Sequence, residues 1–399
     1  MKNLVIIGGG FAGFWAVFSA VRKAKILHKE NEVKITLINK DAYHGLRPRF
    51  YEANLEHTRI LLRDFLEPIG VSLIIDDVIH IDSKSQSIHL KSGNNLIYDK
   101  LIMAAGSKLT IPNIPGLAEY SFNVDTFEAA QRLQQHIDEL IGTPSASGQF
   151  TIVVGGGGFT GVEAATDFMD RLIKVTPKNK NPRVIVIDRS QVAGRFSADV
   201  QNIISEAFAD LGVETISGVE VQKVFHDKIN LSDGSIIATN TLVWTAGMHS
   251  NELTKCFNID LDQFRRLPVD RYLRINGANN CFAAGDVAAA TTDGEHMALL
   301  SCQHAMPQGR FAGNNAIASM FDDELIIYEQ PKFVTSIDLG SWGALYAEGW
   351  DQRVISIKEE AKKIKLFINH DRIYPPNIED KGVVALLEAA EPAFKPIKL

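Results

Sequence analysis

The sequence predicts an α/β protein made of two similar parallel-sheet domains and a small α+β domain at the C-terminal end. Three observations support this prediction. An apolar strand pattern followed by a glycine-rich loop occurs twice, at residues 4–17 and 151–165. A similar series of strand patterns follows each loop. The chain has 399 residues, which exceeds the size at which one hydrophobic core keeps growing.

The composition indicates an ordinary globular chain and excludes several other classes of protein. Hydrophobic residues make up 45% of the chain and charged residues 22%, and the formal net charge is -7. This acidic balance argues against a nucleic-acid partner, because such binding needs clustered Lys and Arg. The first strand pattern starts at residue 4, so we expect no cleavable signal peptide. No uncharged apolar run reaches the roughly 18 residues of a spanning helix. We expect a cytoplasmic protein, attached at most to the inner face of a membrane.

The three cysteines, Cys256, Cys281 and Cys302, predict neither disulfides nor a metal site. None of them forms a pair separated by two residues, so neither a disulfide framework nor a zinc site is indicated. A reducing cytoplasm fits this pattern.

The first glycine loop has the composition and position of a phosphate-binding turn. Residues 8–13 are GGGFAG, which fits G-x-G-x-x-G, and they lie between an apolar strand and a helical pattern. A side chain at either of the first two motif glycines would keep backbone amides away from a pyrophosphate, and the third glycine lets helix and strand pack closely. The anion would lie on the helix N-terminus, whose free N–H groups and dipole favour it. The candidate residues of this loop are Gly8, Gly10, Phe11, Ala12 and Gly13.

The second glycine loop repeats the unit. Residues 156–161 are GGGFTG, between the strand pattern TIVV and a helical pattern, and a second strand pattern ends at residue 188. One glycine-rich loop alone would also fit a turn that binds nothing. The order of strand, glycines, helix and second strand favours a dinucleotide instead. The candidate residues of this loop are Gly156, Gly158, Phe159, Thr160 and Gly161.

The two units differ where the second strand ends. This position usually carries Asp or Glu, which holds a ribose hydroxyl. The first unit has Asn39, followed by Lys40, and an amide can still donate and accept hydrogen bonds. The second unit has Asp188, which would accept bonds from an adenosine 2′-hydroxyl and repel a 2′-phosphate. We therefore expect NADH rather than NADPH, a preference that the neighbouring Arg189 weakens.

Each glycine loop is followed by a similar tail, which indicates duplication of a whole domain. Residues 71–106 and 213–247 share strand patterns, an SG or DG turn and an apolar strand that ends in Ala-Gly. Two complete units in one chain suggest that two dinucleotides bind together. The candidate residues in these tails are Val78, Ala105, Gly106 and Gly247.

Further motifs carry a resemblance to a known family. The strand ends AAG and TAG, together with CFAAGDVA at 281–288, resemble the two-dinucleotide-binding flavoproteins, which are pyridine nucleotide oxidoreductases. The segments LINKDAYHGLRPRFYEA, VVGGGGFTGVEAA, LVWTAG and SCQHAMPQGRFAGNNA make the chain similar to the type II NADH dehydrogenases. This resemblance covers roughly residues 3–320. It implies two Rossmann-like three-layer domains, with FAD on the first loop, NADH on the second and hydride transfer between them.

The resemblance also implies a division of the chain. It predicts a discontinuous FAD-binding domain over residues 1–112 and 248–325, an NAD(P)H-binding domain over 113–247 and a C-terminal cap over 326–399. In the family the cap closes the flavin site and often forms a dimer interface, so a homodimer is one expectation.

The resemblance assigns several residues to the flavin. Asp286 would bind the ribityl chain, although an Asp after a glycine is also a common helix N-cap. Pro48 and its neighbours would line the flavin ring. The helix that begins near His304 would point its N-terminus at the pyrimidine edge, where reduction places negative charge. The residues assigned to the flavin are Arg47, Pro48, Gly285, Asp286, His304 and Ala305.

Two further residues are candidates for catalysis by the same resemblance. Glu163 would lie where nicotinamide and flavin meet, although a carboxylate in this first helical turn would equally suit the helix dipole. Gln308 matches the second Gln of a pair that contacts quinone in type II dehydrogenases, and the first position is Pro307 in this chain. Quinone reduction is therefore open.

Three kinds of electron acceptor remain as alternatives. The first is a quinone, and the second is a protein carrier, oxygen or a pathway-specific small molecule served by a soluble reductase. The third alternative is a redox-sensing flavoprotein that binds NADH without turnover. Disulfide reductases that resemble this chain carry a Cys pair shortly after the first βαβ unit. The residues at that place in this chain include no Cys, so disulfide reduction is not expected. Cys302 is expected to be a buried structural thiol.

Two polar segments each have two interpretations. His44, Arg47 and Arg49 would form either a solvated loop face or a cationic cluster that attracts an anionic acceptor or holds phosphate. Residues 357–368 predict an amphipathic helix, which would lie on anionic lipid or pack on its own protein. The lysines expected mainly outside its apolar face are Lys358, Lys362, Lys363 and Lys365. Residues 326–350 predict strands and turns of the small third domain.

Overall fold

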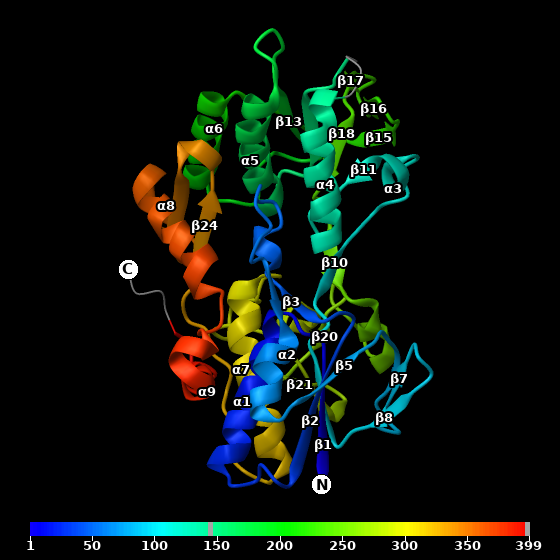
Figure 1. Ribbon diagram of the computed structural model, residues 1–399, viewed down its shortest axis with the longest axis vertical. Helices are drawn as coiled ribbons and strands as arrows, with labels where there is room; N and C mark the ends of the chain where they lie inside the picture. The colour runs from blue at the N-terminus through cyan, green and yellow to red at the C-terminus, as the bar shows by residue number, and fades with distance from the viewer. Residues whose placement is uncertain (143–146, 396–399) are drawn as a thin grey trace.

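The computed structural model describes residues 1–142 and 147–395. Residues 143–146, within the predicted NAD(P)H domain, and 396–399, within the predicted cap, lie outside the described part. Two sheets with parallel cores lie toward opposite ends of the molecule, and the C-terminal segment runs along one side between them (Figure 1).

The first sheet has six strands in the order β21-β22-β9-β1-β2-β5. Neighbouring strands are parallel except β21, which is antiparallel to β22. The chain therefore returns to this sheet after building the second one. The strands are β1 (Lys2–Ile7), β2 (Val33–Asn39), β5 (Ser72–Ile75), β9 (Lys100–Met103), β21 (Arg274–Ile275) and β22 (Ala278–Ala283).

Three layers bury both faces of the first sheet. Leu4 and Ile6 of β1 pack against helices α1 and α7, and Val5 and Ile7 pack against a three-stranded meander on the other face. Because both faces are covered, the central strand is apolar at every one of these positions. The covering elements are α1 (Phe11–Ile26), α2 (Leu62–Leu66), α7 (Cys302–Met320), β6 (Val78–Asp82), β7 (Ser87–Leu90) and β8 (Asn95–Ile97).

The second sheet repeats this plan with five parallel strands in the order β11-β18-β12-β13-β14. Ile152 and Val154 of β12 pack toward the helices, and Val153 packs toward a second meander. The elements are β11 (Ser121–Phe122), β12 (Thr151–Gly155), β13 (Arg183–Asp188), β14 (Val213–Ser217), β18 (Thr241–Trp244), α3 (Leu117–Tyr120), α4 (Phe127–Glu139), α5 (Phe159–Val175), α6 (Ala198–Leu211), β15 (Val221–Val224), β16 (Lys228–Leu231) and β17 (Ile236–Ala238).

The SG and DG turns are found where the sequence predicts them. Gly93 joins β7 to β8 with φ 91°, and Gly234 joins β16 to β17 with φ 87°. A side chain is strained at such positive φ values, which explains the glycine in each hairpin. The α/β fold with two Rossmann-like units is therefore confirmed, and the duplicated tails form equivalent meanders.

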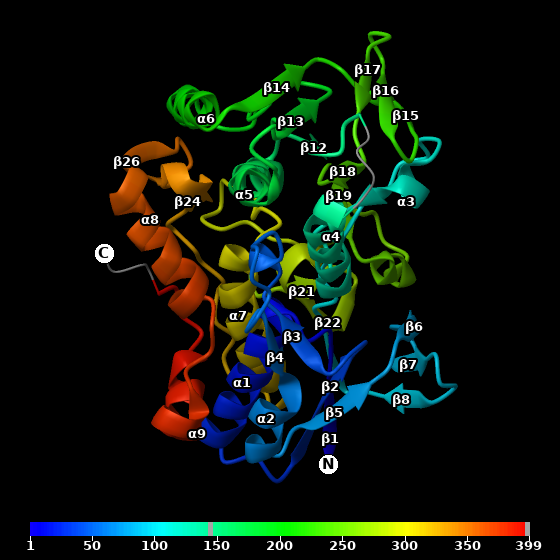
Figure 2. The same ribbon diagram turned by 45° about the horizontal axis from the view of Figure 1, so that its top comes forward.

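The C-terminal segment bridges the two units. Its sheet packs on the second unit through Ile337 and Leu345, and α9 packs on α1 through Leu386 and Leu387. Figure 2 shows α9 beside α1 and β24 beside α5. The elements are β24 (Val334–Asp338), β25 (Ala344–Glu348), β26 (Arg353–Ile357), α8 (Lys358–Phe367), the π-helical turn η7 (Ile368–Arg372) and α9 (Ile378–Ala389).

Short strand pairs complete the fold. The pair β10–β19 is antiparallel and lies where the chain passes between the two sheets. The short strands are β3 (Tyr43–Gly45), β4 (Arg59–Leu61), β10 (Ser107–Leu109), β19 (Met248–Ser250), β20 (Leu267–Pro268) and β23 (Ala288–Ala289). Within the described part of the chain, no helix is both long enough and apolar enough to cross a membrane.

Candidate functional site

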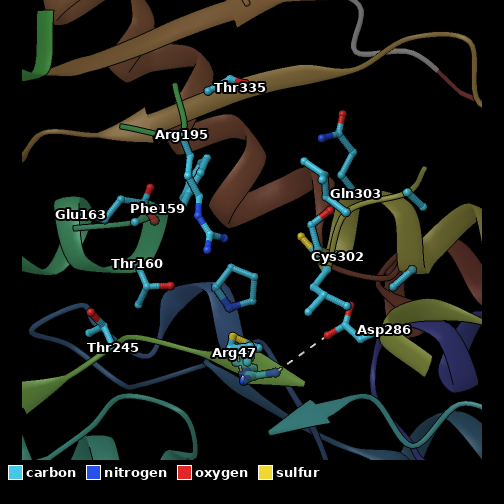
Figure 3. Close-up of a pocket in the computed structure, with 18 of the residues that line it drawn as sticks. Arg47, Phe159, Thr160, Glu163, Arg195, Thr245, Asp286, Cys302, Gln303 and Thr335 are labelled. Carbon is cyan, nitrogen blue, oxygen red and sulfur yellow. Dashed lines mark hydrogen bonds and ion pairs between the residues drawn. The ribbon is translucent and has the colours of Figure 1, made fainter. Parts of the chain in front are cut away.

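A single continuous cavity of about 2030 Å³ lies between the two units and the C-terminal segment. A site for one small ligand or cofactor usually has a volume of roughly 300–1,000 Å³. This cavity therefore has room for more than one nucleotide. Figure 3 shows Phe159, Thr160 and Glu163 from α5 on one side of it and Asp286, Cys302 and Gln303 on another.

The first glycine loop places the N-terminus of α1 at the cavity wall. A Cβ on Gly13 would lie 1.7 Å from the Gly8 carbonyl oxygen, so only glycine allows this close approach of helix and strand. A Cβ on Gly10, by contrast, would meet no protein atom within 4 Å. Gly10, Phe11 and Ala12 line the cavity, and no side chain caps α1. The free N–H groups of this helix end fit a pyrophosphate.

The second glycine loop has the same geometry. A Cβ on Gly161 would lie 1.8 Å from the Gly156 carbonyl oxygen, and a Cβ on Gly158 would meet nothing within 4 Å. Helix α5 also lacks a side-chain cap. Gly156, Gly158, Phe159 and Thr160 line the cavity. The residues present therefore fit a second phosphate-bearing ligand facing the same space.

The ends of the two second strands behave differently. The Asn39 side chain accepts a hydrogen bond from Gly9 N at 2.8 Å and donates to the carbonyls of Asp41 and Tyr43 at 2.9 and 3.1 Å. Neither Asn39 nor Lys40 lines the cavity. Asn39 ties its own loop together, and a ribose contact from either residue stays a prediction.

Asp188, in contrast, lies in the cavity wall together with Arg189. One carboxylate oxygen accepts from Gly157 N at 2.8 Å and the other accepts from Ser190 N and Oγ at 2.8 Å each. Burial opposes the charge, but the hydrogen bonds from Ser190 and Gly157 lower the pKa of Asp188. The carboxylate is therefore ionised at neutral pH and can accept a further bond from a ribose hydroxyl.

The residues assigned to the flavin meet in one polar group. Asp286 accepts a hydrogen bond from Ser107 Oγ at 2.6 Å, and Arg47 donates to the same hydroxyl at 2.9 Å. Arg47 also pairs with Asp125 and lies 3.9 Å from Asp286 Oδ2. Asp286 lies within a short 3-10 turn whose N-cap is Ala284, so it does not act as an N-cap. These charges line the cavity and fit the polar chain of a dinucleotide.

Two assigned residues of α7 lie buried behind the cavity wall. His304 is 1% exposed, its Nδ1 is 3.0 Å from Gln330 Oε1, and burial lowers its pKa to about 4. Gln308 is fully buried, and its Oε1 accepts from Gly285 N at 2.7 Å. The predicted contact of Gln308 with an acceptor stays a prediction. Helix α7 begins at Cys302, next to His304 as expected.

The structure thus divides the candidates into two groups. The candidates that line the cavity are Gly10, Phe11, Ala12, Arg47, Pro48, Gly106, Gly156, Gly158, Phe159, Thr160, Glu163, Asp188, Arg189, Gly247, Gly285, Asp286 and Ala305. The candidates that do not are Gly8, Gly13, Asn39, Lys40, Val78, Ala105, Gly161, His304 and Gln308.

Glu163 forms a buried ion pair that the sequence did not indicate. Its carboxylate lies 2.7 Å from Lys365 Nζ of α8, both side chains are 5% exposed, and Asp338 N donates to the same carboxylate at 2.9 Å. Burial raises the pKa of Glu163, and Lys365 opposes this rise. Lys365 therefore lies on the packed face of α8, although the sequence placed it on a lysine-bearing outer face. The spacing of α8 gave no signal for a partner so far away in the chain.

The polar segment near residue 44 is neither a solvated face nor one cluster. His44 is 1% exposed, and its Nδ1 donates to the Gly9 carbonyl at 2.9 Å. Burial lowers the pKa of His44 to about 4, so the ring is neutral at neutral pH. Arg49 is 5% exposed and pairs with Glu52 at 2.6 Å. Of the three, Arg47 alone lines the cavity.

The three cysteines are free, and Cys302 is only partly buried, not fully buried as the sequence predicts. Cys302 lies in the cavity wall, and burial raises the pKa of its thiol to about 11. The thiol is therefore protonated at neutral pH and is a poor nucleophile. Among the described residues, no two cysteines pair, and no three His, Cys, Asp or Glu side chains group as metal ligands would.

Comparisons with known proteins agree with this geometry. A family model described as pyridine nucleotide-disulphide oxidoreductase matches residues 2–309. An NADH dehydrogenase-like protein of Mycobacterium tuberculosis is 41% identical, with 99% of this chain and 100% of that protein covered. A type II NADH:quinone oxidoreductase of Staphylococcus haemolyticus is 27% identical, with 77% of this chain and 80% of that protein covered.

Solved structures share the fold at low sequence identity. The NDH2 of Plasmodium falciparum in complex with NADH has a TM-score of 0.77 at 15% identity, covering 98% of this chain and 97% of that one. The sulfide:quinone oxidoreductase of Aquifex aeolicus has a TM-score of 0.75 at 19% identity, covering 98% and 92%.

Proposed function

Because the chain belongs to the pyridine nucleotide-disulphide oxidoreductase family, and is thus an NAD(P)H oxidoreductase that uses FAD and NADH, we propose that it reduces a quinone-type or other small acceptor. One observation carries the proposal. Two uncapped helix N-termini, each behind a glycine whose Cβ position is open, face the same cavity. Such a cavity can hold two phosphate-bearing cofactors at once.

The residues of the first unit would hold FAD. Gly10 and the N-terminus of α1 would take the pyrophosphate, and Asp286 with Arg47 would meet the polar chain that leads to the flavin ring. The chemistry that FAD supplies when bound is two-electron transfer from the nicotinamide hydride to the acceptor. The protein contributes binding and orientation.

The residues of the second unit would hold NADH. Gly158 and the N-terminus of α5 would take its pyrophosphate, and ionised Asp188 would accept from the adenosine ribose. A 2′-phosphate beside this carboxylate would be repelled, which supports NADH over NADPH. Arg189 and Arg195 line the same wall and reduce this preference.

The Glu163–Lys365 pair would fix the side of the cavity where the two units and the C-terminal segment meet. The pair joins α5 to α8, and Asp338 of β24 donates to it. Both charges are buried, so the removal of either partner leaves the other unpaired at a high free-energy cost. We assign Glu163 a positioning role in addition to contact with the nicotinamide side of the cavity.

The type II NADH:quinone oxidoreductases among the relatives support a quinone-type acceptor. The cavity extends past the flavin residues to Met306, Ile368 and Phe394, which supply apolar walls that suit an aromatic acceptor. The half-buried Cys302 stays protonated, and this argues for direct reduction of the acceptor without a thiol relay.

A redox titration tests the proposed function. The purified protein should show a flavin spectrum, and NADH added without oxygen should bleach it. Menadione should then restore the colour. A colourless protein that takes up no FAD, or a yellow protein whose absorbance ignores NADH and NADPH, would contradict the proposal. Bleaching without reoxidation by any acceptor would favour the redox-sensing alternative.

Peripheral membrane contact is a further part of the proposal. Leu366 and Phe367 of α8 are 45% and 43% exposed, and the exposed Lys363, one helical turn before them, pairs at 3.7 Å with the exposed Glu359. Such a face suits anionic lipid. Sedimentation with phosphatidylglycerol vesicles tests this contact, with a Leu366→Ser, Phe367→Ser variant as the control. A homodimer likewise stays a prediction, for which sedimentation velocity is the measurement.

A further inference from the structure

Three cationic side chains gather in one corner of the cavity, where Arg372 and Lys395 each lie close enough to Arg310 to act on its charge or feel it. Arg310 comes from α7, Arg372 ends the π-helical turn η7, and Lys395 follows α9. All three line the cavity. Arg372 donates a hydrogen bond to the Lys395 carbonyl, which fixes the two segments to each other. We call these three residues the cationic corner.

Arg310 is buried without an acceptor. The residue is 5% exposed, its Nε is buried with no hydrogen-bond partner, and no described carboxylate pairs with its guanidinium. The guanidinium lies 4.2 Å over the Trp15 ring. Burial and the nearby Arg372 lower the pKa of Arg310 to about 10, so it stays charged at neutral pH. A buried cation of this kind is costly unless something supplies an acceptor.

The surrounding acids do not neutralise the corner. Glu391 lies 3.6 Å from Lys395 Nζ, but its side chain is 52% exposed, so this pair is weak. Burial lowers the pKa of Arg372, and no described acid raises it. Glu52, near the same turn, is already paired with Arg49. Among the described residues, the corner therefore has one buried cation, Arg310, and one partly buried cation, Arg372, that no carboxylate pairs with.

The walls beside the corner are apolar. Met306 precedes Arg310 by one helical turn, Ile368 and Ile373 flank Arg372, and Phe394 precedes Lys395. A free inorganic ion would use the cations but leave these walls unfilled. A ligand with an acidic group at one end and an apolar body would use both.

We propose that the cationic corner binds the carboxylate of an apolar aromatic acid, and that this acid is the electron acceptor of the enzyme. Two arginines can bind a carboxylate with paired, charge-assisted hydrogen bonds, which few other groups satisfy. This identification of the acceptor depends on the proposed function above. NADH gives two electrons and one proton as hydride, solvent gives a second proton, and a carboxylated quinone takes all of them to become the hydroquinone.

A binding experiment tests the corner without redox chemistry. The FAD-loaded protein is titrated with 2-naphthoate, with its uncharged counterpart 2-naphthalenemethanol and with inorganic phosphate, by calorimetry. We expect 2-naphthoate to bind more tightly than the other two probes. Arg310→Gln should weaken it about tenfold to a hundredfold, because one charge-assisted contact is lost. Arg310→Lys should restore part of the affinity. Equal binding of the acid and the alcohol, or no loss in Arg310→Gln, would overturn the proposal.

Matched variants separate this effect from a change of charge or fold. Lys332→Gln removes one positive charge from an exposed part of the cavity rim and should leave 2-naphthoate binding unchanged. If Arg310→Gln fails to fold, Lys395→Gln replaces it as the test variant, because Lys395 is a less buried member of the corner. This variant should also bind 2-naphthoate more weakly. Tighter binding of phosphate than of 2-naphthoate would show an inorganic anion site and would also overturn the proposal.

A second experiment connects the corner to the acceptor. The NADH-reduced protein is mixed without oxygen with 1,4-naphthoquinone-2-carboxylate or with uncharged menadione. Arg310→Gln should raise the KM for the carboxylated quinone about tenfold or more and leave menadione and the rate of bleaching by NADH unchanged. Failure of NADH bleaching in the wild-type protein would sink the proposed function. Normal bleaching with equal loss for both quinones would sink the acceptor assignment alone.

Discussion

The two glycine loops share one backbone and differ in how they are fastened. In the first, Gly9 N donates to the Asn39 amide oxygen at 2.8 Å, and in the second, Gly157 N donates to the Asp188 carboxylate at 2.8 Å. Asn39 is turned inward and uses its remaining donor on its own loop, whereas Asp188 lies in the cavity wall. The comparison shows that both side chains close their loops, but only Asp188 also places a charge in the cavity wall.

The carbonyl groups of the same two glycines show a second difference. The Gly9 carbonyl accepts from the buried ring of His44 at 2.9 Å, and the Gly157 carbonyl accepts from Ala193 N at 2.9 Å. The carbonyl of the first loop thus depends on a histidine ring, whereas the matching carbonyl of the second loop depends on a backbone amide. We infer that the first loop is held by two side chains, and the second by one side chain and one backbone hydrogen bond.

The largest expected effect is a loss of stability that should be the same for the glycine loops of both units. Gly13→Ala and Gly161→Ala each place a methyl group less than 2 Å from a backbone carbonyl. We expect each variant to lose more than about 3 kcal/mol of unfolding free energy, because backbone cannot move aside as a side chain can. Urea unfolding measures this loss. If either alanine variant were as stable as the wild-type protein, the close helix–strand contact would be wrong.

The next largest effect distinguishes the glycine loop of the first unit from that of the second unit. Gly10→Leu and Gly158→Leu add side chains into open space at ordinary negative φ, so both variants should fold. Gly10→Leu should yield a colourless protein. Gly158→Leu should stay yellow but bind NADH on the order of 100-fold more weakly, because the side chain fills the space for the pyrophosphate. Absorbance and anaerobic NADH titration measure both. Loss of both cofactors in either variant would contradict separate sites.

Local sequence predicted the parts of the site that local geometry determines. The spacing of Gly8, Gly10 and Gly13, and of their second copies, sets how closely a helix can approach its strand. The turn glycines Gly93 and Gly234 require positive φ. These constraints act within a few residues, so a single sequence shows them.

Side chains that meet across the fold were not predictable in this way. The Glu163–Lys365 pair, the contact of His44 with Gly9 and the unpaired Arg310 each depend on segments brought together by tertiary packing. An amphipathic pattern placed Lys365 with the outer lysines of its helix. Only the packing of α8 on β24 and β25, and the ion pair of Lys365 with Glu163 of α5, show that it is buried. Motif resemblance located Gln308 on the correct helix but could not show that its amide is buried against Gly285.

The third prediction uses acid to weaken the first half selectively. The pKa of His44 is about 4 in the folded protein and 6.5 when the ring is in water, as in the unfolded chain. Between these pH values the unfolded chain therefore binds more protons than the folded protein. Stability from His44 is therefore full above pH 6.5 and falls as the pH drops toward 4, by about 2 kcal/mol at pH 5. Asp188, whose pKa is lowered, stays ionised in this range.

Urea unfolding and flavin release at pH 7 and pH 5 measure this effect. Burial lowers the pKa of His304 to about 4 and also lowers the pKa of His136, so the wild-type protein reports all three rings. In His44→Asn, the loss of unfolding free energy between pH 7 and pH 5 should be smaller by about the 2 kcal/mol attributed to His44. His304→Gln serves as the matched control. Equal pH dependence in His44→Asn and the wild-type protein would show that the ring does not stabilise the loop.

The smallest effect comes from making the second loop resemble the first. Asp188→Asn keeps an oxygen to accept from Gly157 N but removes the charge, so the loop should stay closed while the ribose contact weakens. We expect about tenfold weaker NADH binding and a smaller preference over NADPH, since one charge-assisted hydrogen bond becomes neutral. The reciprocal variant, Asn39→Asp, should leave NADH binding unchanged because Asn39 does not line the cavity. Titrations of both variants with NADH and NADPH decide the matter, because a purely structural Asp188 would leave the ratio of the two affinities unaltered.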